Sequence, residues 1–330
     1  MSKLVSFMPQ PFVGEHMLSV IARWYLLTGK DDKRALNSLS SSAMQLSMKY
    51  VHHPMVDDVL KLYGKGIARH EALTEHTGLP YHAPLTKYPE LHSIIQQEKY
   101  QGCFSKNRRK IKQTSTPTTR YNSVLKYGDV WRWCHQCVED DTEKLGMPYW
   151  HVAHQLPSTV RCYKHRETAL SVKCKCCNFE IRDLRSALLP PIDNDCYACG
   201  EQVSPIEFNS SDALNFIENA SFDLLNLCGD LKSHRFNYVM QRGLQNYHSR
   251  LLRRYKTKAV FALDKEQQRF NAWLLANGLD IFFHQPDRAL TGKVLDINHG
   301  AYQAKNWPPL SVLLWLAYIG EPWPKLDAVA

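Results

Sequence analysis

The chain has 330 residues, of which 44% are hydrophobic and 11% aromatic, so it is long enough for two or three folded domains and too apolar for a disordered tail. Lysine and arginine number 41 against 32 acidic residues, which gives a net charge of +9. This balance favours polyanionic partners such as DNA, RNA or a ribonucleoprotein. Residues 1–10 lack the apolar run of a signal peptide, and the apolar stretch 310–319 is too short to span a bilayer, so we expect a cytoplasmic protein with no membrane partner.

Three amphipathic helices are predicted in the N-terminal third. Residues 14–29 place apolar side chains at three- and four-residue steps and end at a glycine. A second helix is predicted from Pro54 to Gly64, because proline suits a first helical turn, and a third over residues 67–77. Short helices separated by glycine suit a helix-turn-helix that reads DNA, and they suit a plain helical bundle equally well.

A basic run follows within residues 103–123, before a segment rich in threonine and serine. Its candidate nucleic-acid contacts are Arg108, Arg109 and Lys110. The run is either a solvated linker or an arm that neutralises phosphates. It marks the first boundary of three predicted domains, which are a helical (helix-turn-helix-like) domain over 1–125, a tandem zinc-binding module over 126–208 and a helical domain over 209–330.

Two sets of metal ligands are predicted in the middle domain. The first is Cys134, Cys137, Cys162 and His165, and the second is Cys174, Cys177, Cys196 and Cys199. The second set has the spacing C-x2-C, eighteen residues, C-x2-C that is typical of a structural zinc site, and the first is a looser form of it. Four such ligands close a tetrahedron around Zn²⁺ and leave no position for substrate. The sequence shows no export signal, and disulfides are disfavoured in proteins that stay in the cytoplasm. We therefore expect these cysteines to bind two structural zinc ions.

The histidine of the first set has three neighbours that could replace it, His135, His151 and His154. We favour His165, because Cys162-Tyr-Lys-His165 would place two ligands on one tight turn opposite the first cysteine pair. His151 and His154 are then expected to pack or to form hydrogen bonds. Three further cysteines lack a partner at metal spacing and are expected to be ordinary buried thiols, namely Cys103, Cys176 and Cys228.

Helices return in the last third of the chain. One is predicted after Ser210, with Ser210 or Ser211 as its cap, and another opens at Asp264 and ends at Gly278. A second basic cluster with interleaved tyrosines lies between them and includes Arg250, Arg253, Arg254 and Lys256. Such residues can hold a phosphate backbone and stack on bases, and a solvated helix face explains them equally well. The predicted fold is therefore mainly α, with small zinc-ribbon or zinc-finger β modules.

Motifs of catalysis are missing from the sequence. There is no H-E-x-x-H, no zinc-deaminase signature and no G-x-x-x-x-G-K-[ST] phosphate loop. A catalytic zinc also needs an open coordination position, which neither four-ligand set provides. We therefore expect a binding protein without catalytic residues.

The order of motifs around the first ligand set resembles the TniQ/TnsD family of transposon target-selection proteins. The matching segments are Trp133-Cys-His-Gln-Cys137, Gly146, Tyr149-Trp150-His151, His154-Gln155-Leu156-Pro157 and Cys162-Tyr-Lys-His165. The opening Pro9-Gln-Pro11 also resembles the start of the family, and residues 51–84 are similar to the TnsD branch in particular. The resemblance covers residues 9–200 well and the C-terminal helices only weakly.

This resemblance implies a non-catalytic adaptor that acts on the DNA of a bacterial nucleoid. Family members mark an insertion site and recruit the AAA+ ATPase TnsC, which delivers the transposase. Some read attachment-site DNA directly, and others dock as a homodimer on an RNA-guided Cascade complex. The short segment after Cys199 favours the Cascade-docked adaptor, whereas residues 51–84 and the second basic cluster favour direct DNA contact. A zinc-ribbon transcription regulator is the alternative outside the family.

Overall fold

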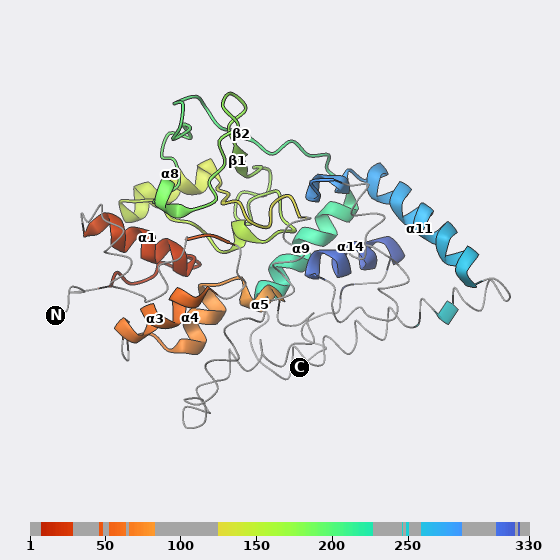
Figure 1. The fold of residues 1–330 in the computed structure, drawn as a ribbon, viewed down its shortest axis with the longest axis horizontal. Helices are drawn as coiled ribbons and strands as arrows, with labels where there is room; N and C mark the ends of the chain where they lie inside the picture. The colour runs from red at the N-terminus through yellow and green to blue at the C-terminus, as the bar shows by residue number, and fades with distance from the viewer. Residues whose placement is uncertain are drawn as a thin grey trace, which may run out of the picture. The chain divides into compact units, whose positions relative to one another are not determined.

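The computed structural model is mainly helical and has few strands, as the sequence predicts (Figure 1). It describes residues 8–28, 46–48, 53–63, 66–82, 125–226, 246, 249–250, 259–285, 308–320 and 323. The α-helices are α1 Met17–Leu27, α3 Pro54–Tyr63, α4 Arg69–Glu75, α5 Leu79–His82, α8 His135–Leu145, α9 Asp212–Asn226, α11 Ala259–Ala276 and α14 Pro309–Ile319. The short 3-10 helices and strands are η4 Ala153–Gln155, η5 Leu184–Ser186, η6 Leu279–Phe282, β1 Ser171–Lys173 and β2 Ser204–Pro205.

The chain divides into two compact units. The described residues of unit 1 lie within Met1–Leu79 and Tyr127–Glu207, so this unit holds the N-terminal helices together with the cysteine-rich segment. The described residues of unit 2 lie mainly within Phe208–Ala330. These units are defined by contacts within the structure. The division into three domains that fold independently stays a prediction.

All three helices predicted in the N-terminal third are present, as α1, α3 and α4. α1 begins at Met17 instead of residue 14, because the backbone before it is not helical. Gly14 has a φ of +70°, and Glu15 pairs with His151 in an antiparallel bridge. α1 packs against α3. Their use as a DNA-reading helix-turn-helix stays a prediction.

α1 contributes to an aromatic core that it shares with the cysteine-rich segment. Trp24, Trp131 and Trp150 are fully buried, and the ring centroids of Trp131 and Trp150 lie 5.5 Å apart. The backbone N–H of Trp150 donates to Ser19 Oγ at 3.1 Å, and the N–H of His16 donates to the Trp150 carbonyl at 2.8 Å. The N-terminal helices are therefore held against the predicted metal region by both apolar packing and hydrogen bonds.

In unit 2, α9 lies beside α14 (Figure 1). Ser211 Oγ accepts the N–H of Leu214 at 3.2 Å, which makes it the cap predicted for α9. α11 begins earlier than the predicted Asp264, and its Phe270 ring packs edge-on against Trp315 of α14, with centroids 5.1 Å apart. Among the residues that the structure describes, no helix is long and apolar enough to cross a membrane.

Two of the N-terminal helices begin with a histidine that accepts a backbone hydrogen bond. Nδ1 of His16 accepts the N–H of Leu18 at 3.1 Å, and Nδ1 of His53 accepts the N–H of Met55 at 3.2 Å. Burial, with smaller contributions from His53 and His76, lowers the pKa of His16 to about 3. A proton on Nδ1 would place a donor against a donor at the positive end of a helix, so the cap requires the neutral ring.

Acidification should therefore destabilise unit 1 through His16. The unfolded ring takes up a proton below its ordinary pKa of 6.5, whereas the folded ring stays neutral down to about 3. The stabilisation is present above 6.5 and is lost as the pH falls towards 3, by up to about 1.4 kcal/mol per pH unit. Urea unfolding between about pH 7.5 and 5 would measure it. His16→Asn keeps a capping oxygen without the titrating ring and should show a shallower pH dependence, and equal slopes would contradict the assignment.

Candidate metal centres

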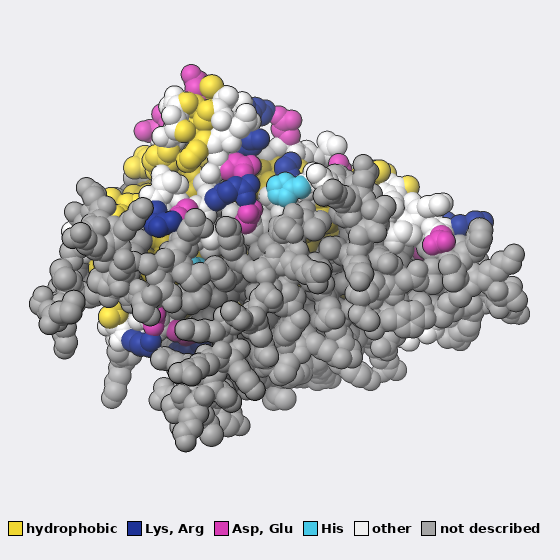
Figure 2. All heavy atoms as spheres, in the orientation of Figure 1, with side chains coloured by type: hydrophobic (Ala, Val, Ile, Leu, Met, Phe, Trp, Pro, Cys, Tyr) yellow, Lys and Arg dark blue, Asp and Glu magenta, His cyan; other side chains and the backbone are white. Residues whose placement is uncertain are grey.

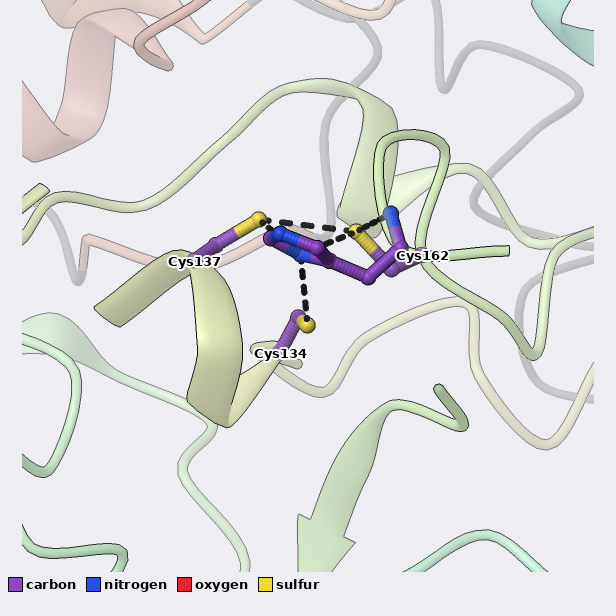
Figure 3. A group of neighbouring side chains, drawn as sticks. Cys134, Cys137 and Cys162 are labelled. Atoms are coloured by element: carbon purple, nitrogen blue, oxygen red, sulfur yellow. Dashed lines mark hydrogen bonds between the residues drawn. The ribbon is translucent and has the colours of Figure 1, made fainter. Parts of the chain in front are cut away.

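The structure brings the first predicted ligand set together at the start of α8. In Figure 3, Cys134 and Cys137 lie at the beginning of a helix, with their sulfur atoms close to Cys162 on a separate loop. The Nδ1 atom of His165 lies between 3.4 and 3.7 Å from the three sulfur atoms. A tetrahedral zinc ion would hold nitrogen and sulfur ligands about 3.5 Å apart. The four ligand atoms of this cluster, called site 1, are therefore spaced for one metal ion.

Helix α8 is an element that the sequence analysis did not predict. Cys134 occupies the N-cap position without a side-chain capping hydrogen bond, Cys137 lies in the first turn, and Gly146 ends the helix with a φ of +79°. The apolar pattern is weak because only three of its side chains are buried, namely Cys137, Val138 and Asp141. The helix places its free N–H groups and its partial positive charge beside two cysteine sulfurs. Hydrogen bonds among the three cysteines, together with burial, nevertheless raise the pKa of Cys134 to about 12 and also raise the pKa of Cys137.

The sulfur of Cys162 is surrounded by hydrogen-bond donors. It accepts the backbone N–H groups of Lys164 and His165, both at 3.3 Å, and lies 3.3 Å from Nε2 of His154. Hydrogen bonds from the Cys134 and Cys137 thiols lower the pKa of Cys162, and His154 adds to this effect. The thiolate is the form that binds a metal ion, so Cys162 is the cysteine of site 1 that its surroundings favour in the metal-binding form.

A second layer of polar groups orients the site 1 ligands. Nε2 of His165 lies 3.3 Å from a carboxylate oxygen of Asp140, so its Nδ1 is left to face the sulfurs. Nε2 of His151 lies 2.6 Å from a carboxylate oxygen of Asp141, and His154 contacts Cys162 as described. His151 and His154 thus form hydrogen bonds, as the sequence analysis expects. The sequence pattern does not single out Asp140 as a partner of His165, although Asp140 lies on the face of α8 that carries Cys137. Carboxylates behind a histidine ligand fix its orientation and raise its basicity.

The second predicted ligand set also converges and is called site 2. The Sγ atoms of Cys174 and Cys199 lie 3.6 Å apart, and those of Cys177 and Cys196 lie 3.5 Å apart. A tetrahedral zinc ion would separate two sulfur ligands by about 3.8 Å. The backbone N–H of Cys177 lowers the pKa of Cys174 to about 7. The donor set therefore fits one metal ion that prefers thiolates.

Each half of site 2 is a tight turn that closes on a left-handed residue. Asn178 follows Cys177 with a φ of +60°, and Gly200 follows Cys199 with a φ of +76°. Asparagine and glycine are the residues that adopt this conformation most easily, which explains their place after each cysteine pair. The strands β1 and β2 pair antiparallel on either side of these turns. The narrower zinc-ribbon arrangement stays a prediction.

The expectation that Cys176 is a buried thiol is wrong, because its side chain is exposed. Cys174 and Cys177 lie on either side of it in the sequence, and both of their sulfurs face the centre of site 2. The side chain of Cys176 therefore faces solvent. Cys103 and Cys228 lie outside the described residues.

The residues that carry the family resemblance connect site 1 to the N-terminal segment. The hydroxyl of Tyr149 donates to the Val13 carbonyl at 2.9 Å, and the Tyr149 ring stacks on His151 with centroids 4.2 Å apart. The side-chain amide of Gln155 exchanges two hydrogen bonds with the backbone of Arg132, at 3.0 and 2.8 Å. These motif residues are therefore structural supports of the metal site.

Most of the predicted nucleic-acid contacts lie outside the described residues, namely Arg108, Arg109, Lys110, Arg253, Arg254 and Lys256. Arg250 is described and exposed. On the face shown in Figure 2, acidic, basic and hydrophobic side chains are interspersed over the described surface. The contact of these residues with DNA or RNA stays a prediction.

Replacing His165 with alanine should remove one of the two expected metal ions, because site 1 would keep only three ligands. Replacing His154 with alanine should leave both ions in place and weaken the affinity of site 1 by about 10- to 100-fold, the usual effect of an outer-layer partner. Elemental analysis after desalting measures the number of ions, and competition with a chelating dye measures the affinity. If His154→Ala lost an ion and His165→Ala kept both, His154 would be the metal ligand and His165 the hydrogen-bonding partner.

Comparison with known proteins identifies a family that matches part of the chain. The TniQ family model matches residues 6–168, which include α1, α3, α4, α8 and all four site 1 ligands. No curated protein matches the chain. Site 2 lies beyond the matched region.

Proposed function

This chain belongs to the TniQ family through residues 6–168, and we infer from that membership that it takes part in selecting the target site of a bacterial DNA transposon. We further propose that it is a non-catalytic adaptor that recruits the AAA+ ATPase TnsC. The observation that carries this proposal is the closed site 1 within the matched region. Its four ligand atoms lie within 4.8 Å of one another, so one tetrahedral metal ion held by all four would stabilise the fold and leave no position for a substrate.

Zn²⁺ is the metal ion that we propose for both sites. Three thiolates with one imidazole, and four thiolates, are donor sets that zinc prefers, and the spacings fit its tetrahedral geometry. In each site the ion would fix loops that contain few apolar residues of their own. Bound zinc would thereby hold the surface of unit 1 in one shape for a partner.

Two routes to the target remain as proposals. In the first, the adaptor docks on an RNA-guided Cascade ribonucleoprotein, and the guide RNA supplies sequence specificity. In the second, the chain binds attachment-site DNA directly, which its net charge of +9 supports. A free-standing zinc-ribbon regulator is disfavoured by the family match.

The two routes are separated by binding of the purified full chain to duplexes in about 150 mM salt, where non-specific binding is weak. The duplexes would be the transposon's attachment site and a scrambled sequence of equal length. For an RNA-guided adaptor we expect equal, weak binding to both duplexes and co-purification with Cascade and TnsC. Tight, selective binding to the attachment site without guide RNA would establish the direct route. Failure to retain TnsC in either case would contradict the adaptor proposal.

A further inference from the structure

A groove of about 970 Å³ lies in unit 1, between α8 and the segment before and within β2. One face of α8 forms the first side, since residues spaced by three, four and seven positions lie on the same face of a helix. The lining residues of this side are His135, Glu139, Thr142 and Glu143. Those of the opposite side are Ile192, Asp193, Asn194, Gln202, Val203, Ser204 and Pro205. Ser171 of β1 also lines the groove.

The charged side chains of this groove are acidic, although the chain as a whole is basic. Glu139, Glu143 and Asp193 are exposed, and the described structure contains no ion pair for any of them. Lysine and arginine are absent from its described lining residues. Three carboxylates repel a phosphate backbone and attract cationic groups, so this surface is unsuited to DNA or RNA.

A buried hydroxyl in the groove lacks a hydrogen-bond partner. Ser171 is only 1% exposed, and its Oγ atom has no partner among the described residues. A buried hydroxyl without a partner is destabilising, which is a reason to expect an occupant that completes its hydrogen bonding. On the opposite side, Ile192 is 54% exposed and offers an apolar contact beside the carboxylate of Asp193.

The arrangement of the carboxylates distinguishes between kinds of cation. The described groups whose ligand atoms lie within 4.8 Å of one another are sites 1 and 2, and the groove carboxylates are in neither. They therefore suit several separate cationic side chains better than one metal ion. The nearby Ile192 adds a place for an apolar side chain between them.

We propose that this groove docks a peptide segment of a partner protein in which arginine or lysine alternates with apolar residues. The cationic side chains pair with Glu139, Glu143 and Asp193, and the segment supplies a hydrogen bond to Ser171. The proposal goes beyond target selection, because it assigns one face of unit 1 to a protein partner whichever way the target DNA is found.

Photo-crosslinking to the full chain tests this assignment. The probe is a biotinylated peptide of alternating arginine and leucine with one benzophenone side chain, and its control is the same peptide with glutamate in place of arginine. We expect the basic peptide to label residues 135–145 or 192–205 and the acidic peptide to label neither. Labelling by the basic peptide should weaken as salt is raised.

Matched variants distinguish binding of the basic peptide in the groove from its non-specific attraction to acidic side chains elsewhere. Glu139→Gln with Glu143→Gln should lower the affinity for the basic peptide about fivefold. Glu71→Gln with Glu75→Gln removes two exposed charges at the same spacing on α4 and should leave the affinity unchanged. Ser171→Ala should lower the affinity and raise the melting temperature of the free chain, because it removes a buried hydroxyl without a partner.

The proposal is overturned by absence of labelling with the basic peptide, by labels confined to other segments, or by equal labelling with both peptides. It is also overturned if the groove variant and the α4 variant bind the basic peptide equally while both remain folded by circular dichroism. Because none of these outcomes depends on TnsC, Cascade or an attachment site, the result is independent of the proposed function.

Discussion

Replacing Cys162 with serine should prevent unit 1 from folding. A structural zinc contributes an apparent roughly 10–16 kcal/mol, which is as large as the roughly 5–15 kcal/mol net stability of a typical domain. Cys162 is fully buried and lies in the cluster that joins α8 to the loop carrying His165. Limited proteolysis with mass spectrometry should reveal new cleavage within residues 8–28 and 127–207. Chelation of the native protein should produce the same pattern.

Site 2 provides the matched control for this experiment. Cys199 is exposed, and the ligands of site 2 lie on two turns beside a pair of very short strands. Loss of an ion from site 2 should therefore disturb a smaller part of unit 1 than loss of an ion from site 1. For Cys199→Ser we expect new cleavage only within residues 174–205. An identical pattern for both variants, or a protease-resistant Cys162→Ser chain, would show that site 1 does not hold the core together.

Replacing Arg23 with alanine should destabilise unit 1 by about 3–5 kcal/mol, because it leaves a buried carboxylate without its partner. Two nitrogen atoms of Arg23 each donate to a different oxygen of Glu15 at 2.8 Å, and both side chains are buried. Burial raises the pKa of Glu15, whereas the Arg23 guanidinium opposes that rise. Urea unfolding followed by tryptophan fluorescence would measure the loss, since Trp24 and Trp150 lie in this core.

The exposed pair of Lys61 and Asp58 supplies the control for this second result. Their charged atoms lie 2.5 Å apart in solvent. Lys61→Ala should cost less than about 1 kcal/mol, as is usual for surface ion pairs. Exchanging the buried pair for Glu15→Gln with Arg23→Leu should recover part of the stability that Arg23→Ala loses. Equal losses for Arg23→Ala and Lys61→Ala would mean that the buried pair has no special role.

Local signals account for the features that sequence analysis predicted well. Cysteine spacing specified both ligand sets, because a tight C-x2-C turn brings two sulfurs together whatever surrounds it. Apolar periodicity and glycine positions located α1, α3 and α4, since amphipathic helices bury one face. The alternatives for the histidine ligand stayed open, because spacing alone does not say which of several nearby rings faces the sulfurs.

Long-range contacts account for what sequence analysis missed. Helix α8 is mostly polar, and its place in unit 1 depends on metal ligands and on few buried residues. The late start of α1 depends on the pairing of Glu15 with His151, far along the chain. Asp140 contacts His165, and His154 contacts the sulfur of Cys162. Both contacts depend on how the histidine rings are oriented in the folded chain. The groove is formed by α8 and residues 192–205, which are separated in sequence by both β1 and half of site 2.

Local spacing and periodicity are enough to predict the two ligand sets, the mainly helical class and the resemblance to the TniQ family. Three features become visible only in the folded chain: His165 faces the three sulfurs, the N-terminal helices share a core with site 1, and acidic residues line a groove beside it. These features depend on burial, hydrogen bonding and charge, which act between residues that are close in space and distant in the chain.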